Sequence, residues 1–318
     1  MRQTGLEMER GVVRALSLLV LAGGESEERE ISLLSGAAVA ESLAQRGHRV
    51  RLEDPAGLPF RKHPQSILRH VDAVIPMVHG RGGEDGSLQR TLQTHAAVWP
   101  GCSAEAAELT FDKARTRERL LAAGVPVSRG FSLRRTDALP SLCHLRGQLV
   151  VKPARQGSSI GISIIQGRDE LRAALDLAWS FSVEAIVEEY IPGREISVPV
   201  ADDRILPAVE IMAPNGWYDF HSKYQSAETR YVVGPDSCPD EVNEIVTAAC
   251  RVCGVTGLSR TDLRITSEGQ IYVLEINTVP GMTSHSLVPM SAAAVGLSSG
   301  ELLEQMLVRR MLQPGMVG

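Results

Sequence analysis

The feature that most constrains this chain is a pair of strand-like segments near its C-terminus. LSRTDLRIT (258–266) and QIYVLEINT (270–278) flank a short Ser-Glu-Gly turn at 267–269. Two runs rich in β-branched and apolar residues around such a turn predict an antiparallel hairpin. The second run ends at Pro280-Gly281, which stops a strand at a defined point. The hairpin therefore fixes which of its polar side chains can face one another.

Those polar side chains are two acids and an amide. Side chains two residues apart in a strand leave the same face about 6.6 Å apart, so Glu275 and Asn277 share a face. Asp262 lies on the opposing strand, with Arg260 on the same face by the period of two. A solvent-facing polar strand is the simpler interpretation, but the apolar neighbours on both faces predict burial. Buried carboxylates need a partner, and hard oxygen donors favour Mg²⁺.

A magnesium ion held by few protein ligands completes its coordination with nucleotide phosphates. The chain contains neither GxxxxGK[ST] nor GxGxxG, so the P-loop and the dinucleotide fingerprint are excluded. ARQGSSIG (154–161) instead predicts a Gly/Ser-rich hairpin tip whose backbone N–H groups cover phosphates. Lys152 precedes this tip at the end of a strand.

Length and charge narrow the class of protein. A chain of 318 residues exceeds one ordinary core, so two or three domains are expected. A net charge of −5 and an aromatic content of 4% argue against a nucleic-acid-binding surface. No segment approaches the roughly 20 apolar residues of a membrane span. The run ALSLLVLAGG (15–24) has no convincing cleavage site after it, which favours a first buried strand over a signal peptide.

The five cysteines are odd in number and scattered, which predicts reduced thiols and a cytosolic protein. Cys250 and Cys253 have metal-like spacing, but no second pair completes a site. They fall in a helical apolar pattern, so core packing is the preferred interpretation.

Three regions follow one another along the chain. After a polar extension over 1–13, alternating strands and helices predict a parallel sheet with ligands beyond its carboxyl ends. Its expected strands are 15–22, 49–54, 73–80 and 97–101, and its expected helices are 27–46 and 85–95. The middle region predicts helices at 103–109, 112–123 and 169–179, a hairpin from QLVVK and ISII, and a strand over 183–190. The last region, from Ile191 onward, is predicted to be rich in strands. Its expected elements are a hairpin from 194–203 and 204–211, a polar loop over 213–236 and a helix beyond Pro239.

Six motifs together resemble the D-alanine–D-alanine ligases of the ATP-grasp superfamily. They are GGESEEREISLLSG, VHGRGGEDGSLQ, DKARTR, VVKPARQGSSIGIS, SRTDL and LEINTVPGMTSHSLVPM, in the family order. The resemblance implies an α/β fold (α+β overall) with three domains and ATP between the second and third. The expected divisions are an extension (1–13), a substrate-binding domain (14–101), a central subdomain with a lid hairpin (102–190) and a C-terminal subdomain (191–318).

The resemblance also implies a two-step reaction in peptidoglycan synthesis. One D-alanine carboxylate attacks the γ-phosphate of ATP, and a second D-alanine amine attacks the resulting acyl phosphate. The implied cofactor is a pair of Mg²⁺ ions, with Mn²⁺ as an alternative, and the implied assembly is a cytoplasmic homodimer without nucleic-acid or membrane partners.

On the nucleotide side, the resemblance assigns roles by motif position. The implied metal ligands are Asp262, Glu275 and Asn277. The implied ATP contacts are Lys113, Lys152 and Lys223 to phosphates, Glu188 to the adenine amino group and Glu195 to the ribose hydroxyls. Arg260 and the N–H of Gly281 would form the oxyanion hole.

On the amino-acid side, Glu28 would bind the ammonium of the first D-alanine, with His79 nearby. Ser158 and Tyr224 would hydrogen-bond toward Glu28 and close two loops over the site. The second substrate's carboxylate would be received by Ser286 and Leu287. Taken singly, each has a simpler interpretation: Glu28 as a solvated helix start and His79 as a loop cap.

Two residues depart from the family pattern, and several alternatives stay open. Gln156 stands where a lid glutamate is common, and Glu189 replaces a lysine next to Glu188, which predicts weaker or shifted ATP binding. D-lactate or D-serine as the second substrate is the nearest alternative, and Tyr224 favours D-alanine. A specialised-metabolite ligase, a non-catalytic nucleotide-binding module and a Rossmann-type oxidoreductase are the further alternatives. The intact metal cluster argues against the module, and the missing glycine fingerprint against the oxidoreductase.

Overall fold

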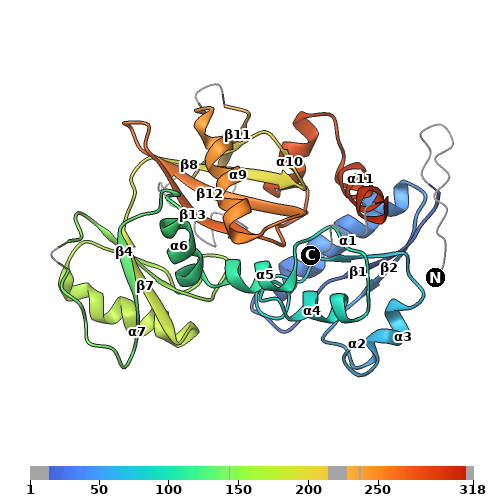
Figure 1. The fold of residues 1–318 in the computed structure, drawn as a ribbon, viewed down its shortest axis with the longest axis horizontal. Coiled ribbons are helices and arrows are strands. Elements are labelled where there is room, and N and C mark those ends of the chain that lie inside the picture. The colour runs from blue at the N-terminus through green and yellow to red at the C-terminus, as the bar shows by residue number, and fades with distance from the viewer. Residues whose placement is uncertain (1–13, 143, 214–227, 236–237, 313–318) are drawn as a thin grey trace.

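The computed structural model describes residues 14–142, 144–213, 228–235 and 238–312, so the expected extension over 1–13 lies outside the described residues. Three separate sheets run along the molecule, as Figure 1 shows, one in each of the regions expected from the sequence. The first is parallel, and the other two are antiparallel. This mixed α/β architecture agrees with the predicted fold class.

The first sheet has the order β2-β1-β3, with all strands parallel. Its strands are β1 (Ser17–Leu21), β2 (Arg49–Glu53) and β3 (Ala73–Pro76), and its helices are α1 (Arg29–Gln45), α2 (Leu58–Lys62), α3 (Pro64–Leu68) and α4 (Ser87–Thr94). The strand expected at 97–101 is not formed. One backbone bond, from Val74 N–H to the Val98 carbonyl at 2.8 Å, is present there. Pro100 has no N–H with which to continue a ladder.

The second sheet has the order β4-β7-β5-β6 and is antiparallel. Its elements are β4 (Gly130–Arg134), β5 (Leu149–Pro153), β6 (Ser163–Ile165), β7 (Glu184–Glu189), the short helix η1 (Arg168–Glu170) and the helix α7 (Leu171–Phe181). The preceding helices α5 (Ala104–Phe111) and α6 (Lys113–Ala122) pack instead on the core of the third sheet. The predicted β5–β6 hairpin is confirmed. Strand β4 was missed because Leu133 alone among its five residues is buried, which leaves no clear apolar pattern.

The third sheet has the order β11-β10-β8-β12-β13, with β9 also paired to β8. Its elements are β8 (Arg194–Ala201), β9 (Arg204–Ile205), β10 (Val209–Met212), β11 (Arg230–Val233), β12 (Leu258–Ile265), β13 (Ile271–Asn277) and the helix α9 (Glu241–Cys253). The predicted β12–β13 hairpin is confirmed. The expected polar loop over 213–236 is wrong at its end, since β11 pairs with β10 there.

The cysteines of α9 are core residues, as the helical pattern predicted. Cys250 and Cys253 are buried in the apolar core between α9 and the third sheet. Burial raises the pKa of the Cys253 thiol to about 12. A thiol so protonated is a poor nucleophile and metal ligand.

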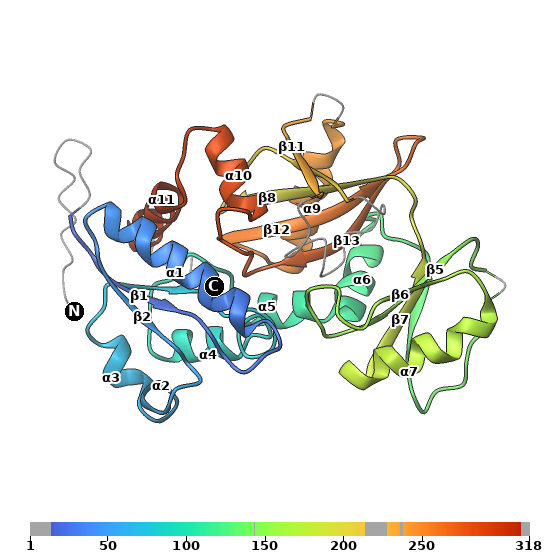
Figure 2. The same cartoon turned by 180° about the vertical axis from the view of Figure 1, so that it is seen from behind.

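The strand-rich remainder is confirmed by the third sheet, and two C-terminal helices that the sequence analysis did not predict follow it. Helix α10 (Leu287–Ala294) covers the third sheet, whereas α11 (Ser299–Leu312) lies beside α1 of the first region (Figure 2). Leu303 and Leu307 of α11 share a buried core with Val39 and Leu43 of α1. The chain therefore returns to its first region after building the third. None of the described helices is both long enough and apolar enough to cross a membrane.

Candidate active site

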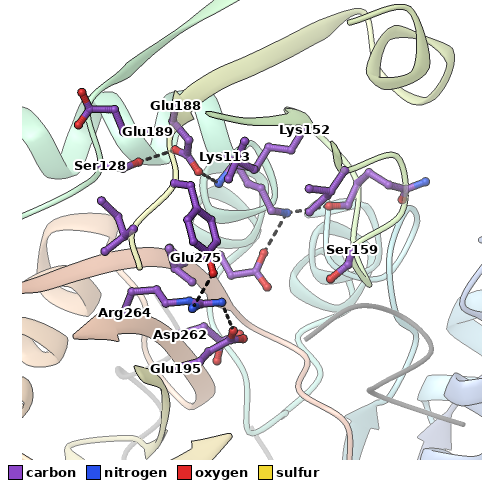
Figure 3. A pocket seen from close by; sticks show the side chains of 16 residues that line it. Lys113, Ser128, Lys152, Ser159, Glu188, Glu189, Glu195, Asp262, Arg264 and Glu275 are labelled. Carbon is purple, nitrogen blue, oxygen red and sulfur yellow. Dashed lines mark hydrogen bonds and ion pairs between the residues drawn. The ribbon is translucent and has the colours of Figure 1, made fainter. Parts of the chain in front are cut away.

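Two cavities meet at the junction of the three regions. The first lies between the second and third sheets (Figure 3), and its charged lining includes Lys113, Lys152, Glu188, Glu195, Asp262, Arg264 and Glu275. The second reaches the N-terminal region, and its polar lining includes Glu28, Glu84, Lys113, Ser158, Arg260, Glu275 and Asn277. The side chains common to both linings are Lys113 and Glu275. A phosphate group and an amino acid could therefore meet at this pair.

The hairpin brings the predicted acids together. Asp262 and Glu275 are direct partners across the β12–β13 ladder, and Arg260 is paired with Asn277. Arg260 donates to Asp262 with both Nε and Nη2, at 2.9 and 2.8 Å. Ser197 on β8 also donates to Asp262, at 2.6 Å. The Asp262 carboxylate is thus fixed by a two-point ion pair and by a buried hydroxyl.

Glu275 is paired with the other side of the cavity. Lys113, at the start of α6, places its Nζ 3.2 Å from Glu275 Oε2 and donates to the Gln156 carbonyl at 2.7 Å. Asn277 accepts the Val279 N–H with its side-chain oxygen at 2.9 Å, which turns the chain at the end of β13. Lys113 is the first residue of α6 because Asp112 caps the helix. The Asp112 side chain accepts a hydrogen bond from the Arg115 N–H.

These oxygen donors fit a divalent cation. Both Asp262 and Glu275 hold a cationic side chain against their oxygens, which is the charge that a metal would supply. Over the described part of the chain, no group of three or more His, Cys, Asp and Glu side chains is placed to bind a metal. The Asn277 amide is therefore needed as the third ligand of the predicted set.

The far end of the first cavity holds a buried ion pair. Lys152 on β5 and Glu188 on β7 pair with each other, and their side chains are only 9% and 8% exposed. Ser128 donates to the second Glu188 oxygen at 2.8 Å. Arg117 Nε lies 4.0 Å from the same oxygen. Glu188 is thus held by Lys152 and Ser128, with Arg117 nearby, and neither Ser128 nor Arg117 is among the site residues predicted from the sequence.

Glu195 is held by an arginine that was not predicted. Arg264 donates to Glu195 Oε2 at 2.9 Å, and Figure 3 shows the pair at the lower edge of the cavity. Arg264 follows Arg260 and Asp262 at intervals of two residues on β12. The period of two that placed Asp262 would therefore also have found Arg264.

At the N-terminal end, Ser158 on the Gly/Ser tip donates a hydrogen bond to Glu28 Oε1. Gly157 permits this approach, since a Cβ there would lie 2.5 Å from Glu28 Oε2. Ser158 itself adopts the left-handed region, with φ of 51°, which is unfavourable for a side chain other than glycine. The tip therefore touches Glu28 through a conformation that its sequence does not prefer.

His79 joins the N-terminal region to the segment after β13. Its Nδ1 lies 2.9 Å from the Val279 carbonyl and its Nε2 lies 3.2 Å from Ser35 Oγ. Glu84 is 3.8 Å from Nδ1. Ser35 also accepts the Met282 N–H at 3.3 Å. These contacts place the loop around Gly281 next to the second cavity.

The remaining predicted residues fall in different places. Ser286 is the residue before α10, and its hydroxyl accepts the Thr283 N–H at 3.1 Å. A Cβ at Gly281 would lie 2.9 Å from Ser286 Oγ, so glycine lets these two segments approach. The Leu287 side chain is buried against β10 and leaves its backbone N–H at the helix start. Lys223 and Tyr224 lie outside the described residues.

Comparisons with known proteins show which family this chain is similar to. A family model described as D-ala D-ala ligase C-terminus matches residues 136–308. The D-alanine–D-alanine ligase of Actinobacillus succinogenes is 38% identical over 303 residues, covering 91% of this chain and 96% of that protein.

Two solved structures extend the comparison to three dimensions. The D-alanine–D-alanine ligase from Bacillus anthracis complexed with ATP has a TM-score of 0.81 and 26% identity, covering 94% of this chain and 98% of that one. The VanG D-Ala:D-Ser ligase from Enterococcus faecalis has a TM-score of 0.75 and 26% identity, covering 93% of this chain and 99% of that one.

Proposed function

The chain belongs to the D-alanine–D-alanine ligase family, and on that premise we propose that it joins two D-alanine molecules at the expense of ATP. The reaction passes through D-alanyl phosphate. The observation that carries the proposal is the meeting of the two cavities at Lys113 and Glu275. One cavity suits a nucleotide with its phosphates at this junction, and the other suits an amino acid with its carboxylate there.

In the first step, the carboxylate of the first D-alanine attacks the γ-phosphorus and ADP leaves. Lys113 binds the phosphates at the junction together with Lys223, and Lys152, which is paired with Glu188, binds the phosphate nearest the adenosine. Asp262, Glu275 and Asn277 would hold two Mg²⁺ ions, or Mn²⁺, which neutralise phosphate charge when bound. The residues of the chain align the two reacting atoms and hold them out of water.

At the other end of ATP, Glu188 accepts from the adenine amino group and Glu195 accepts from the ribose hydroxyls. The support for both roles is their position in the first cavity, where each carboxylate is already oriented by protein donors. Glu189 lies in the same lining but accepts the Arg146 N–H at 2.9 Å. The acid that replaces the common lysine is thus engaged with backbone at the cavity edge.

In the second step, the free amine of the second D-alanine attacks the acyl carbon, and phosphate leaves with the bonding electron pair. Arg260 and the Gly281 N–H stabilise the oxyanion of the tetrahedral intermediate. Glu28 holds the ammonium of the first D-alanine, with His79 beside that subsite. Ser286 and the backbone of Leu287 receive the carboxylate of the second D-alanine, at the start of a helix where an anion is favoured.

Closure over the site protects the acyl phosphate from hydrolysis. Ser158 hydrogen-bonds to Glu28 from the Gly/Ser tip, and we propose that Tyr224, which lies outside the described residues, hydrogen-bonds toward the same acid. The contact between Ser158 and Glu28 joins the second region to the first across the substrate cavity.

The wider setting follows from the same premise. The three sheets support a division into a substrate domain (14–101), a central subdomain (102–190) and a C-terminal subdomain (191–318), with α11 packed back on the first. We place the protein in the cytoplasm as a homodimer that supplies D-alanyl-D-alanine for peptidoglycan.

The proposal is tested by measuring phosphate release from ATP and Mg²⁺ with D-alanine alone, and then with D-lactate or D-serine added. We expect D-alanine alone to support turnover and to give D-alanyl-D-alanine as the product found by mass spectrometry. A product containing D-lactate or D-serine as the main species would identify a different second substrate. Absence of any D-alanine-dependent phosphate release would overturn the proposal.

A further inference from the structure

One buried cation in the first cavity has no role in either chemical step. Arg264 lines the cavity, and its side chain is only 5% exposed. A guanidinium in this position is costly unless its donors are paired. Its partners therefore indicate why an arginine is there.

Its first partner is Glu195. Arg264 on β12 and Glu195 on β8 are direct partners in the antiparallel ladder, so the backbone fixes their side chains opposite each other. Nη2 of Arg264 donates to Glu195 Oε2 at 2.9 Å. A carboxylate offers about four acceptor positions, so this bond leaves capacity for ligand hydroxyls.

The other donors of Arg264 hold the segment that connects β7 to β8. Nη1 donates to the Gly193 carbonyl at 3.1 Å and reaches the Tyr190 hydroxyl at 3.4 Å. The guanidinium carbon lies 5.4 Å from the centre of the Tyr190 ring, within the range of a cation–π contact. At Gly193, a Cβ would overlap the Ile265 carbonyl, so the segment is pressed against β12.

Tyr190 and Glu195 both line the first cavity, and Arg264 contacts both. A rigid fork on a central strand thus fixes one aromatic wall and one hydrogen-bond acceptor of the same site. A lysine could keep the charge, but it could not make the same directed set of bonds.

We propose that Arg264 is a positioning residue for the nucleotide, which orients Glu195 toward the ribose hydroxyls and Tyr190 as a wall of the nucleotide site. It acts through these two residues and sets the preference for ATP over deoxy-ATP. The inference rests on the ribose role of Glu195 in the proposed function.

The test measures the Kd of ATP, 2′-deoxy-ATP and 3′-deoxy-ATP by calorimetry, together with kcat and KM for ATP. In Arg264→Met we expect KM for ATP to rise about tenfold, with the loss falling on KM rather than kcat. The ratio of deoxy-ATP Kd to ATP Kd should fall about tenfold for at least one deoxy-nucleotide, since a hydrogen bond to a charged group is lost. Arg264→Lys should recover part of this ratio.

A matched control comes from the same sheet. Arg194 makes a two-point pair with Glu210 at 2.8 and 2.7 Å, and neither residue is among the described lining of the first cavity. Arg194→Met removes a two-point but less buried arginine–glutamate pair from β8 and should leave the Kd ratio unchanged. An equal fall of the ratio in both variants would show a general loss of structure and overturn the proposal.

Glu195→Ala separates this inference from its premise. If Glu195→Ala lowers the ratio while Arg264→Met and Arg264→Lys leave it at the parent value, the positioning role of Arg264 is wrong and the ribose role of Glu195 stands. If Glu195→Ala also leaves the ratio unchanged, the ribose role is wrong and the inference fails with it. A ratio lowered by both substitutions supports the proposal.

Discussion

The two ends of the first cavity differ in what their ion pairs leave for a ligand to do. At the junction with the second cavity, Asp262 is paired with Arg260 and Glu275 with Lys113. In the proposed function the two carboxylates bind metal and the two cations bind substrate groups. Ligand binding must therefore separate each carboxylate from its cation. We call this the transfer end.

At the opposite end, the pairs join groups that bind one nucleotide together. Lys152 with Glu188, and Arg264 with Glu195, are held by neighbouring strands of one sheet in each case. Binding ATP need not separate them. We call this the base end.

Ion pairs thus act in two different ways within one cavity. At the transfer end, cations balance the carboxylates until ligands exchange partners with them. At the base end, ion pairs fix acceptors in advance, which lowers the cost of ordering them on binding. Substitutions at the transfer end should therefore act on kcat, and those at the base end on ATP affinity and stability.

The largest expected effect is that of Glu275→Gln at the transfer end. The change removes one negative charge from the metal site and the partner of Lys113. We expect kcat to fall about a thousandfold, because phosphoryl transfer depends on charge neutralisation at this point. The measurement is D-alanine-dependent phosphate release at saturating substrates.

Glu268→Gln is the matched control for that substitution. Glu268 lies in the exposed turn of the same hairpin and hydrogen-bonds to Ser267 at 2.7 Å. It should keep full activity, and both variants should melt close to the parent. A Glu275→Gln enzyme with more than a tenth of the parent kcat would remove the distinction between the two ends.

An effect of intermediate size, on the free energy of unfolding, is expected from Lys152→Met at the base end. The change leaves Glu188 buried without its cation, and breaking a buried pair in this way costs about 3–5 kcal/mol of unfolding free energy. Urea denaturation measures the loss. The double variant Lys152→Met with Glu188→Gln should recover much of the stability while keeping weak ATP binding, and a double variant no more stable than the single one would contradict the explanation.

The sequence predicted the hairpin that builds the transfer end and missed much of the base end, for a physical reason. Asp262, Glu275 and Asn277 lie on two strands joined by a tight turn, so the period of two places them together from local information. Ser128, in the segment before β4, meets Glu188 on β7, which lies 60 residues further along the chain. Such contacts depend on sheet order, which no local pattern encodes.

The same limit applies to the fold. The parallel first sheet follows from strand–helix alternation, and the β5–β6 hairpin from its short connection. The placement of α11 against α1 could not be predicted, because Leu303 and Leu307 make an ordinary amphipathic pattern that does not identify its partner. Strand β11 was also not predicted from the sequence, since none of its four residues is fully buried and only alternate ones are half-buried.

The smallest effect is expected at a solvent-exposed ion pair, which serves as a reference for the buried pairs at both ends of the cavity. Arg309 donates to Asp203 at 2.8 Å through Nη2, and the Asp203 side chain is 72% exposed. The hydrogen bond from Arg309 lowers the pKa of Asp203 from 3.8 to about 2. A depressed pKa in the folded state means that the stabilisation is present above pH 4 and lost as the pH falls toward 2.

Asp203→Asn should therefore lower the unfolding free energy at pH 7 by less than about 1 kcal/mol, since water screens an exposed pair. The difference between variant and parent should shrink as urea denaturation is repeated from pH 5 down to pH 3. Arg309→Gln should show the same pH profile, because it removes the same bond from the other side. A difference that grows toward low pH, or that equals the loss in Lys152→Met, would show that burial is not what separates strong pairs from weak ones in this protein.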